Sequence, residues 1–192
     1  LMEEGNLTSE QVAEVLGLPD GVDPLSFNPF DIDETDATQV ANALAVEKTS
    51  QQVMSVVTAV ASAAEGAGAS EADAFTAALN SVVKVVQDKA ANLTKEDASD
   101  AEKSLDLANA DDLVLIQTQA KDAVENISGL SESQVTAFDN LAADTATAVI
   151  NVNDRIAGVE DLDDGADVFS SVQVLADQVA EAVADEVETP DS

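Results

Sequence analysis

Apolar side chains recur at three- and four-residue steps along most of this chain, which is the spacing of one face of an α-helix. The longest such segment runs from Asp36 to about Glu65. Its apolar positions are Ala43, Val46, Val53, Val57, Val60 and Ala64. At 1.5 Å per residue they line a helix roughly 40 Å long. Gly66 and Gly68 follow and are expected to end this helix.

Four further segments carry the same periodicity, and each begins with a side chain that can cap a helix. These segments are 70–92, 109–128, 131–157 and 164–188. Their expected capping residues are Ser70, Asn109, Ser131 and Asp164. The apolar stripe of the first segment consists of Phe75, Leu79, Val82, Val83, Val86 and Ala90. The more polar stretch 94–107 is either a connector or a short surface helix capped by Thr94.

We predict an all-α fold, an antiparallel helical bundle of about five main helices plus short ones, in a single domain over residues 1–192. It is expected to comprise a lead helix at 1–16, an ordered loop at 17–36 and the bundle at 37–188. The loop is rich in aspartate and holds three of the four prolines, which restrict its backbone. Four apolar side chains of the loop should pack on the bundle. They are Leu25, Phe27, Phe30 and Ile32.

The chain carries 7 basic and 39 acidic residues, which gives a formal net charge of −32. So acidic a protein cannot neutralise phosphate groups, and we expect neither nucleic-acid binding nor attachment to anionic membranes. The longest weakly polar run, 53–64, is shorter than the roughly 20 residues of a membrane span, so no membrane insertion is expected. Repulsion among the carboxylates should make folding sensitive to salt and to divalent cations.

The residue types that most often carry out catalysis are missing from the sequence. There is no Cys, His, Trp or Tyr, so thiolate metal sites and the commonest proton-transfer and nucleophilic groups are excluded. A carboxylate-based hydrolase would have to work without the Trp and Tyr platforms on which sugars usually stack. We therefore expect a protein that is not an enzyme and that requires no cofactor.

Two acidic clusters are candidate sites for a hard cation such as calcium, which prefers oxygen ligands. The first consists of Asp31, Asp33, Thr35 and Asp36. The second is weaker and consists of Asp161, Asp163 and Asp167, around Gly165. The first is not an EF-hand, because Asp36 and Asn42 stand where that loop requires Gly and Glu. The alternative is that Asp36 and Asp164 cap helices, and that the neighbouring carboxylates favour the positive helix N-terminus.

The stretch Leu16-Gly-Leu-Pro-Asp-Gly-Val-Asp-Pro-Leu-Ser-Phe-Asn-Pro-Phe30, followed by the long Ala/Val helix, resembles a helical module of very large bacterial surface and secreted proteins. Those proteins often also carry immunoglobulin-like, cadherin-like or calcium-binding repeats. In them a helical segment commonly precedes the Leu-Pro motif, and residues 1–16 are similar to its last part, so a piece of a longer chain is expected. The resemblance implies an extracellular or cell-surface location and a structural or adhesive role, and it brings no catalytic residues.

Our first functional hypothesis is a non-enzymatic extracellular module, a helical spacer or assembly unit of a larger bacterial surface protein or filament. Its partner would be another protein or a second copy of itself. The second hypothesis is a calcium-binding module whose stability is set by divalent cations, and a carboxylate-based hydrolase is a distant third. Calcium bound at a defined stoichiometry would favour the second, because a spacer is stabilised by ionic strength whatever the ion.

Overall fold

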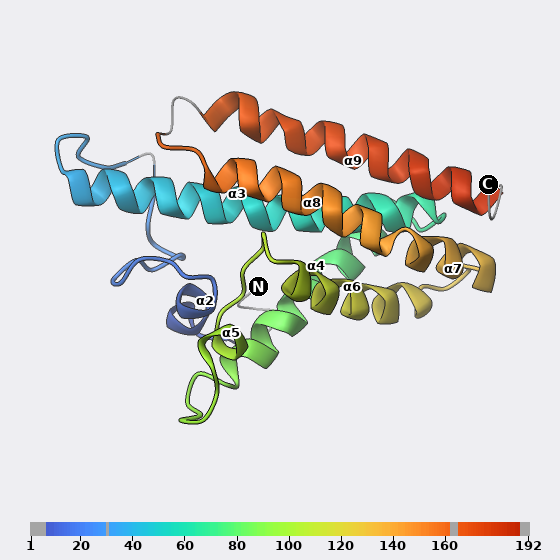
Figure 1. The fold of residues 1–192 in the computed structure, drawn as a ribbon, viewed down its shortest axis with the longest axis horizontal. Helices are drawn as coiled ribbons and strands as arrows, with labels where there is room; N and C mark the ends of the chain where they lie inside the picture. Colours follow the sequence, from blue (N-terminus) through green and yellow to red (C-terminus); the bar gives the residue numbers. More distant parts are fainter. Residues whose placement is uncertain (1–6, 30, 162–164, 189–192) are drawn as a thin grey trace.

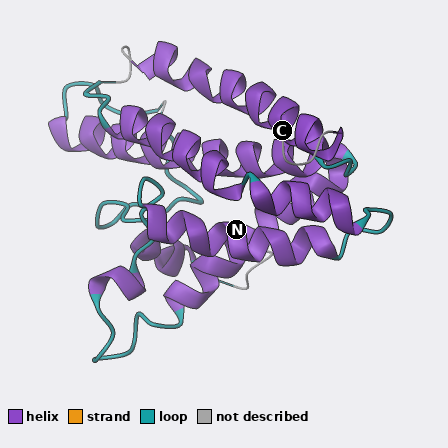
Figure 2. Ribbon diagram, turned by 45° about the vertical axis from the view of Figure 1, so that its right-hand side comes forward, coloured by secondary structure: helices purple, strands orange, loops and turns teal. Residues whose placement is uncertain are grey.

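The computed structural model describes residues 7–29, 31–161 and 165–188. Over these residues the chain forms eight helices and no strand (Figure 2). The helices are α2 (Ser9–Val15), α3 (Ala37–Gly66), α4 (Glu71–Ala90), α5 (Asp100–Lys103), α6 (Ala110–Glu125), α7 (Glu132–Asn140), α8 (Ala142–Ala157) and α9 (Gly165–Glu188). The predicted all-helical fold is thus confirmed for the described part of the chain.

Most helices begin where the sequence places a capping side chain. At the start of α3, the carboxylate of Asp36 accepts hydrogen bonds from the backbone N–H groups of Thr38 and Gln39. Side-chain caps also open α2, α4, α6 and α7. Their capping residues are Thr8, Ser70, Asn109 and Ser131. Such bonds satisfy N–H groups that the first helical turn leaves unpaired. Asp164, the expected cap of α9, lies outside the described residues.

Helix α3 lies at the centre of the fold, and α4, α8 and α9 all pack against it (Figure 1). Four residues of its predicted stripe are buried. They are Ala43, Val57, Val60 and Ala64. Val46 and Val53 are only half-buried. Five other residues of α3 are also buried, namely Ser55, Val56, Ala59, Ala61 and Ala63. Because neighbours lie on several sides, burial extends around the second half of α3 instead of following one stripe.

The long helices do not all alternate in direction, as an antiparallel bundle would require. Helix α8 runs opposite to α3. Lys48 Nζ donates to the Ala157 carbonyl (2.8 Å), and one turn later along α3 Gln52 Nε2 donates to the Asn153 carbonyl (3.1 Å). Helix α9 instead runs in the same direction as α3 (Figure 1). The predicted antiparallel arrangement is therefore not confirmed for this pair.

Gly66, the last residue of α3, accounts for the close approach of α9. A Cβ atom at this position would lie 2.4 Å from the carbonyl oxygen of Ala180 and 3.0 Å from the Cβ of Val183. Any side chain would therefore collide with the α9 backbone, and only glycine fits without a shift. Gly66 was expected to end α3, which it does. The apolar periodicity of the sequence gives no sign of its contact with α9.

The segment 131–157 forms two helices where the periodicity predicts one. Helix α7 ends at Asn140, and α8 begins at Ala142. Leu141, between them, has φ −93° and ψ 2°, which departs from the α-helical region. The break changes the course of the chain, so that α7 packs against α6 and α9 while α8 follows α3. The apolar spacing runs unbroken through residue 141 and gives no sign of this change.

The buried face of α4 is also turned relative to the predicted stripe. Phe75 is 48% exposed, whereas the neighbouring Ala74 and Ala78 are fully buried. Small side chains at these two positions permit close packing of α4 on the rest of the core, and the large ring at position 75 lies beside the contact instead of within it. The expectation that Phe75 belongs to the core is therefore wrong.

The loop at 17–36 packs differently from its prediction. Among the described residues of this loop, Val22 is the buried apolar one, whereas Leu25 is 71% exposed, and Phe27 and Ile32 are half-buried. Phe30 lies outside the described residues. Backbone hydrogen bonds from Val22 to Pro19 and from Phe27 to Asp23 form turns within the loop. The predicted docking of Leu25 is thus wrong.

Among the described helices, none combines the length and the apolar character needed to cross a bilayer.

Candidate functional site

A buried ion pair joins α4 to α6. Lys89 Nζ, near the end of α4, lies 2.6 Å from Asp112 Oδ1 in the first turn of α6. It also donates to the Ala101 carbonyl of α5 at 2.6 Å. The side chains of Lys89 and Asp112 are only 8% and 13% exposed. A charge so far removed from water requires partners of this kind.

The same carboxylate also holds the connector between α4 and α6. Asp112 Oδ2 accepts a hydrogen bond from the backbone N–H of Asp106 (2.8 Å). The side chains of Leu105 and Leu107 are buried beside it. The N–H of Leu105 donates to the carbonyl of Val15 at the end of α2 (2.8 Å). Within the connector, residues 101–107 are therefore bonded to α2, α4 and α6.

Asn153 of α8 fastens this connector to the long helices. The residue is fully buried, and its Nδ2 donates to the Leu107 carbonyl at 2.7 Å. Its backbone carbonyl accepts from Gln52 of α3. Asn153 thus links α3, α8 and the connector through directed hydrogen bonds, which supports a structural role for this amide.

The short helix α5 begins at Asp100, five residues after the start that a cap at Thr94 would give. Ser99 precedes it, and the carboxylate of Glu102 accepts hydrogen bonds from the Ser99 N–H and hydroxyl (both 2.8 Å). The bond from the Ser99 N–H has the larger effect, and together with the bond from the hydroxyl it holds the pKa of Glu102 below its usual value. Thr94 lies in a turn, so the alternative of a surface helix capped by Thr94 is wrong.

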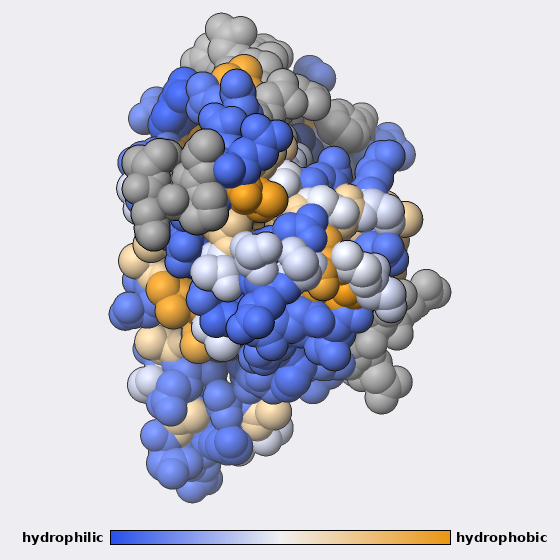
Figure 3. Space-filling model, turned by 90° about the vertical axis from the view of Figure 1, so that its right-hand side faces the viewer, coloured by the Kyte–Doolittle hydropathy of each residue, from blue (hydrophilic) through white to orange (hydrophobic). Residues whose placement is uncertain are grey.

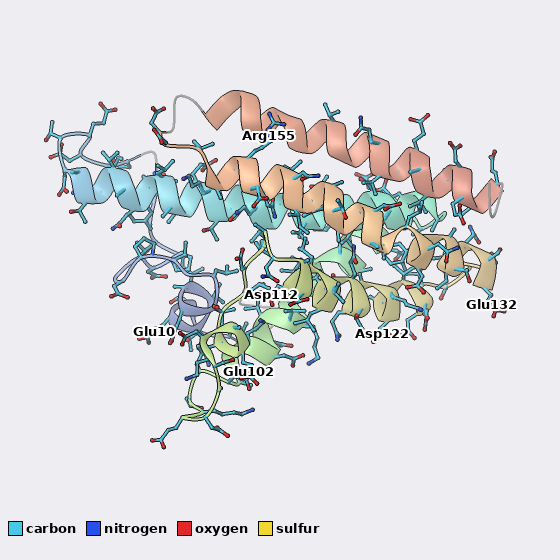
Figure 4. The ribbon with its side chains drawn as sticks, in the orientation of Figure 1. Glu10, Glu102, Asp112, Asp122, Glu132 and Arg155 are labelled. Carbon is cyan, nitrogen blue, oxygen red and sulfur yellow. The ribbon has the colours of Figure 1, made fainter. Side chains whose placement is uncertain are left out.

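A cavity of about 620 Å³ opens beside the ion pair. We call it the acidic groove. It lies between the end of α4, α5, residues 104–109 and the start of α6. Its carboxylates are Asp88, Glu102, Asp106, Asp111 and Asp112. Its apolar wall is formed by Val85, Ala101 and Leu115. In Figure 4 Glu102 and Asp112 lie on the side of the molecule away from α9.

Two neighbouring apolar residues of α6 face solvent near this groove. Val114 is 55% exposed and Leu115 is 46% exposed, and Leu115 also lines the groove. The end of the molecule formed by α7 is by contrast mainly hydrophilic, with small separate apolar areas (Figure 3). An exposed apolar pair at the edge of a concave surface is typical of a contact site for another molecule.

The structure gives the predicted cation ligands Asp33 and Asp36 local hydrogen-bond partners. Asp33 Oδ1 accepts from the hydroxyl and the N–H of Thr35 (2.7 and 2.9 Å), and these bonds lower the pKa of Asp33. Asp36 caps α3, and hydrogen bonds from the N–H groups of Gln39 and Thr38 lower its pKa. Asp31 is exposed.

The second predicted cluster is only partly visible. Asp161 is exposed, Asp163 lies outside the described residues, and Asp167 belongs to α9 but its side chain is not among those described. Within the described residues, no group of three or more acidic side chains is arranged to hold a metal ion.

Lys89 and Asp112 were not among the candidate residues. One signal for Lys89 does exist, because it lies four residues after Val85 and three after Val86, and therefore on the buried face of α4. A lone cation at helical spacing from buried valines indicates a paired charge. Asp112 has no such signal, since it is also an ordinary acidic residue in a first helical turn.

Comparisons of the chain with models of protein families, with curated proteins and with solved structures find no match.

Proposed function

We propose that this chain is a non-enzymatic structural and interaction module of a larger extracellular or cell-surface protein, in which it acts as a helical spacer or assembly unit. The observation that carries the proposal is the exposed apolar pair Val114 and Leu115 beside the acidic groove. Apolar surface of this kind loses contact with water when a partner binds, which stabilises the complex.

The arrangement of the long helices supports the spacer role. Helix α3 has 30 residues and is therefore about 45 Å long, and α8 and α9 lie along it (Figure 1). Lys89, Asp112 and Asn153 use their polar groups to join helices, which is the behaviour of residues that hold a shape. In this proposal residues 17–36 form an ordered entry to the bundle, and residues 1–192 act as one unit.

The location can be tested on intact cells of the source organism. An antibody against the folded chain should label unpermeabilised cells or the culture medium, and added protease should remove that label. A known internal protein of the same cells provides the control for lysis. Labelling that appears only after permeabilisation would contradict the extracellular role, whatever the chain binds in solution.

A further inference from the structure

The acidic groove has a strong excess of negative charge. Five carboxylates line it, and Lys89 is its one lining cation. Lys84 lies just outside and pairs with Asp88, and Lys95 and Lys103 act on Glu102 from nearby, so the excess of negative charge belongs to the lining itself, with five carboxylates and one ammonium group. The ammonium of Lys89 is itself buried and bonded to Asp112 and Ala101. Among the lining residues, a ligand therefore meets carboxylates and not a free cation.

The groove also offers apolar contact. Leu115 is about half exposed on one wall, and Val85 and Ala101 lie on the others. A cationic side chain with a hydrocarbon stem can place its charge near the carboxylates and its stem against these residues. A bare metal ion would gain nothing from the apolar wall. The combination is therefore matched by lysine or arginine next to an apolar side chain.

A second copy of this chain is a poor occupant. Each copy carries a net charge of −32 with only seven basic residues. Five of these already bond to groups of their own chain. They are Lys48, Lys84, Lys89, Lys95 and Lys121. Two copies would therefore bring like charges together at the groove with few cations to offset them.

From these observations we infer that the acidic groove is a docking site for a basic, partly apolar peptide segment of a partner protein. This inference rests on the proposed interaction role and names the chemistry of the partner. The carboxylates attract and orient the segment, and Leu115 with its neighbours supplies the apolar contact. The attraction between the charges should weaken as salt rises.

Fluorescence anisotropy with a labelled peptide of alternating arginine and leucine residues tests the inference. Two further peptides carry citrulline in place of arginine, or serine in place of leucine. The groove variants are Leu115→Ser and Asp111→Asn. Their matched controls lie outside the groove, namely Met54→Ser on α3, which is 47% exposed, and Asp122→Asn on α6. Circular dichroism establishes that each variant is folded, and all four side chains are exposed, so folding should be preserved.

We expect each groove variant to weaken binding about tenfold, each control to change it less than about twofold, and both altered peptides to bind weakly. Equal losses for groove variants and controls would overturn the inference, since they would indicate general attraction to an acidic surface. Displacement of the peptide by calcium at one ion per chain would also overturn it, as would self-association that requires Leu115.

Failure of peptide binding for a chain found on the cell surface would reject this inference alone. Binding by a chain confined inside cells would reject the proposed function alone.

Discussion

Two regions of this molecule are held together by different means. In the long-helix region, α3, α8 and α9 pack through small apolar residues, and Gly66 brings two backbones into contact. In the connector region, formed by α2, the end of α4, residues 91–109 and the start of α6, polar bonds from Lys89, Asp112 and Asn153 fix the chain. The first depends mainly on shape, to which the bonds of Lys48 and Gln52 to α8 are added, and the second depends mainly on charge and donor geometry.

The difference shows how so acidic a chain uses its few cations. Three of the seven basic residues, Lys89, Lys95 and Lys103, fall within 15 positions of one another in the connector region. Lys89 holds Asp112 and the Ala101 carbonyl, and Lys95 donates to Asn92. Helix α9 contains no basic residue at all. Regular helices can thus be packed with few cations, such as Lys48 of α3 on the Ala157 carbonyl of α8, whereas an irregular connector with many polar groups requires more of them.

The largest effect is expected from breaking the buried ion pair of the connector region. Asp112→Ala leaves the Lys89 ammonium buried with a single carbonyl partner and removes the acceptor for the Asp106 N–H. We expect the free energy of unfolding to fall by about 3 kcal/mol or more. Urea denaturation measures this change.

The control for that prediction is Asp88→Ala on α4, which removes the same charge. The Lys84–Asp88 pair is 49% and 59% exposed, so its loss should change the free energy of unfolding by less than about 1 kcal/mol. Similar losses for both variants would show that the connector region does not depend on its buried pair.

The next effect concerns the long-helix region. Gly66→Ala places a Cβ atom 2.4 Å from the Ala180 carbonyl oxygen, so α9 has to move. The cost of overpacking is about 1–3 kcal/mol, partly offset by the better helix propensity of alanine. A net loss of about 1–2 kcal/mol is expected in urea denaturation.

Gly158→Ala is the matched control at the end of α8. Gly158 has φ −75°, and the nearest atoms to an added Cβ lie at 3.5 Å. This change should be neutral or stabilise by up to about 1 kcal/mol. If the two alanine variants proved equally stable, close packing at Gly66 would not hold α9 in place.

The sequence predicts the elements of both regions better than their relations. Helix starts follow from capping groups such as Asp36 and Ser131, because capping is decided by a few adjacent residues. The parallel course of α9, the break at Leu141 and the exposure of Phe75 depend on neighbours that are distant in the chain. The acidic groove was missed for the same reason: Asp88 and Asp112 come from two helices, and only the packing of α4 on α6 brings them together.

A smaller effect is expected at the start of the long-helix region. Asp36→Ala removes the cap of α3 and should lower the melting temperature at pH 7, whereas Asp36→Asn should nearly preserve it, because asparagine caps equally well. Both variants remove one charge, so general repulsion is matched. Equal losses for the two variants would mean that charge and not capping matters at this position.

The pH dependence of that gap has a definite sign. Hydrogen bonds lower the folded-state pKa of Asp36 below 3.8, so its ionised form stabilises the folded state above that value. The advantage of the wild type over Asp36→Ala should be constant near pH 7 and decline as the pH falls below about 3.8 through the folded-state pKa. Thermal melts from neutral to acidic pH provide the measurement, and a gap that widened in acid would contradict it.

The smallest effect should come from the loop that enters the long-helix region. The alternative of a calcium site there predicts that the double variant Asp31→Asn/Asp33→Asn loses a calcium-dependent rise in melting temperature. The bonds from Thr35 to Asp33 show instead how that carboxylate is used within its own turn. We therefore expect the wild type and the double variant to respond equally to calcium and to sodium chloride of matched ionic strength.

Asp122→Asn/Glu125→Gln on α6 matches the change in net charge, and melts in chelator give the reference. The contrary result is a rise in melting temperature that is specific to calcium, present in the wild type and in the α6 variant but absent from the double variant. It would establish the cation site. Ion binding would then help to stabilise the long-helix region, in addition to the shape of its packed residues.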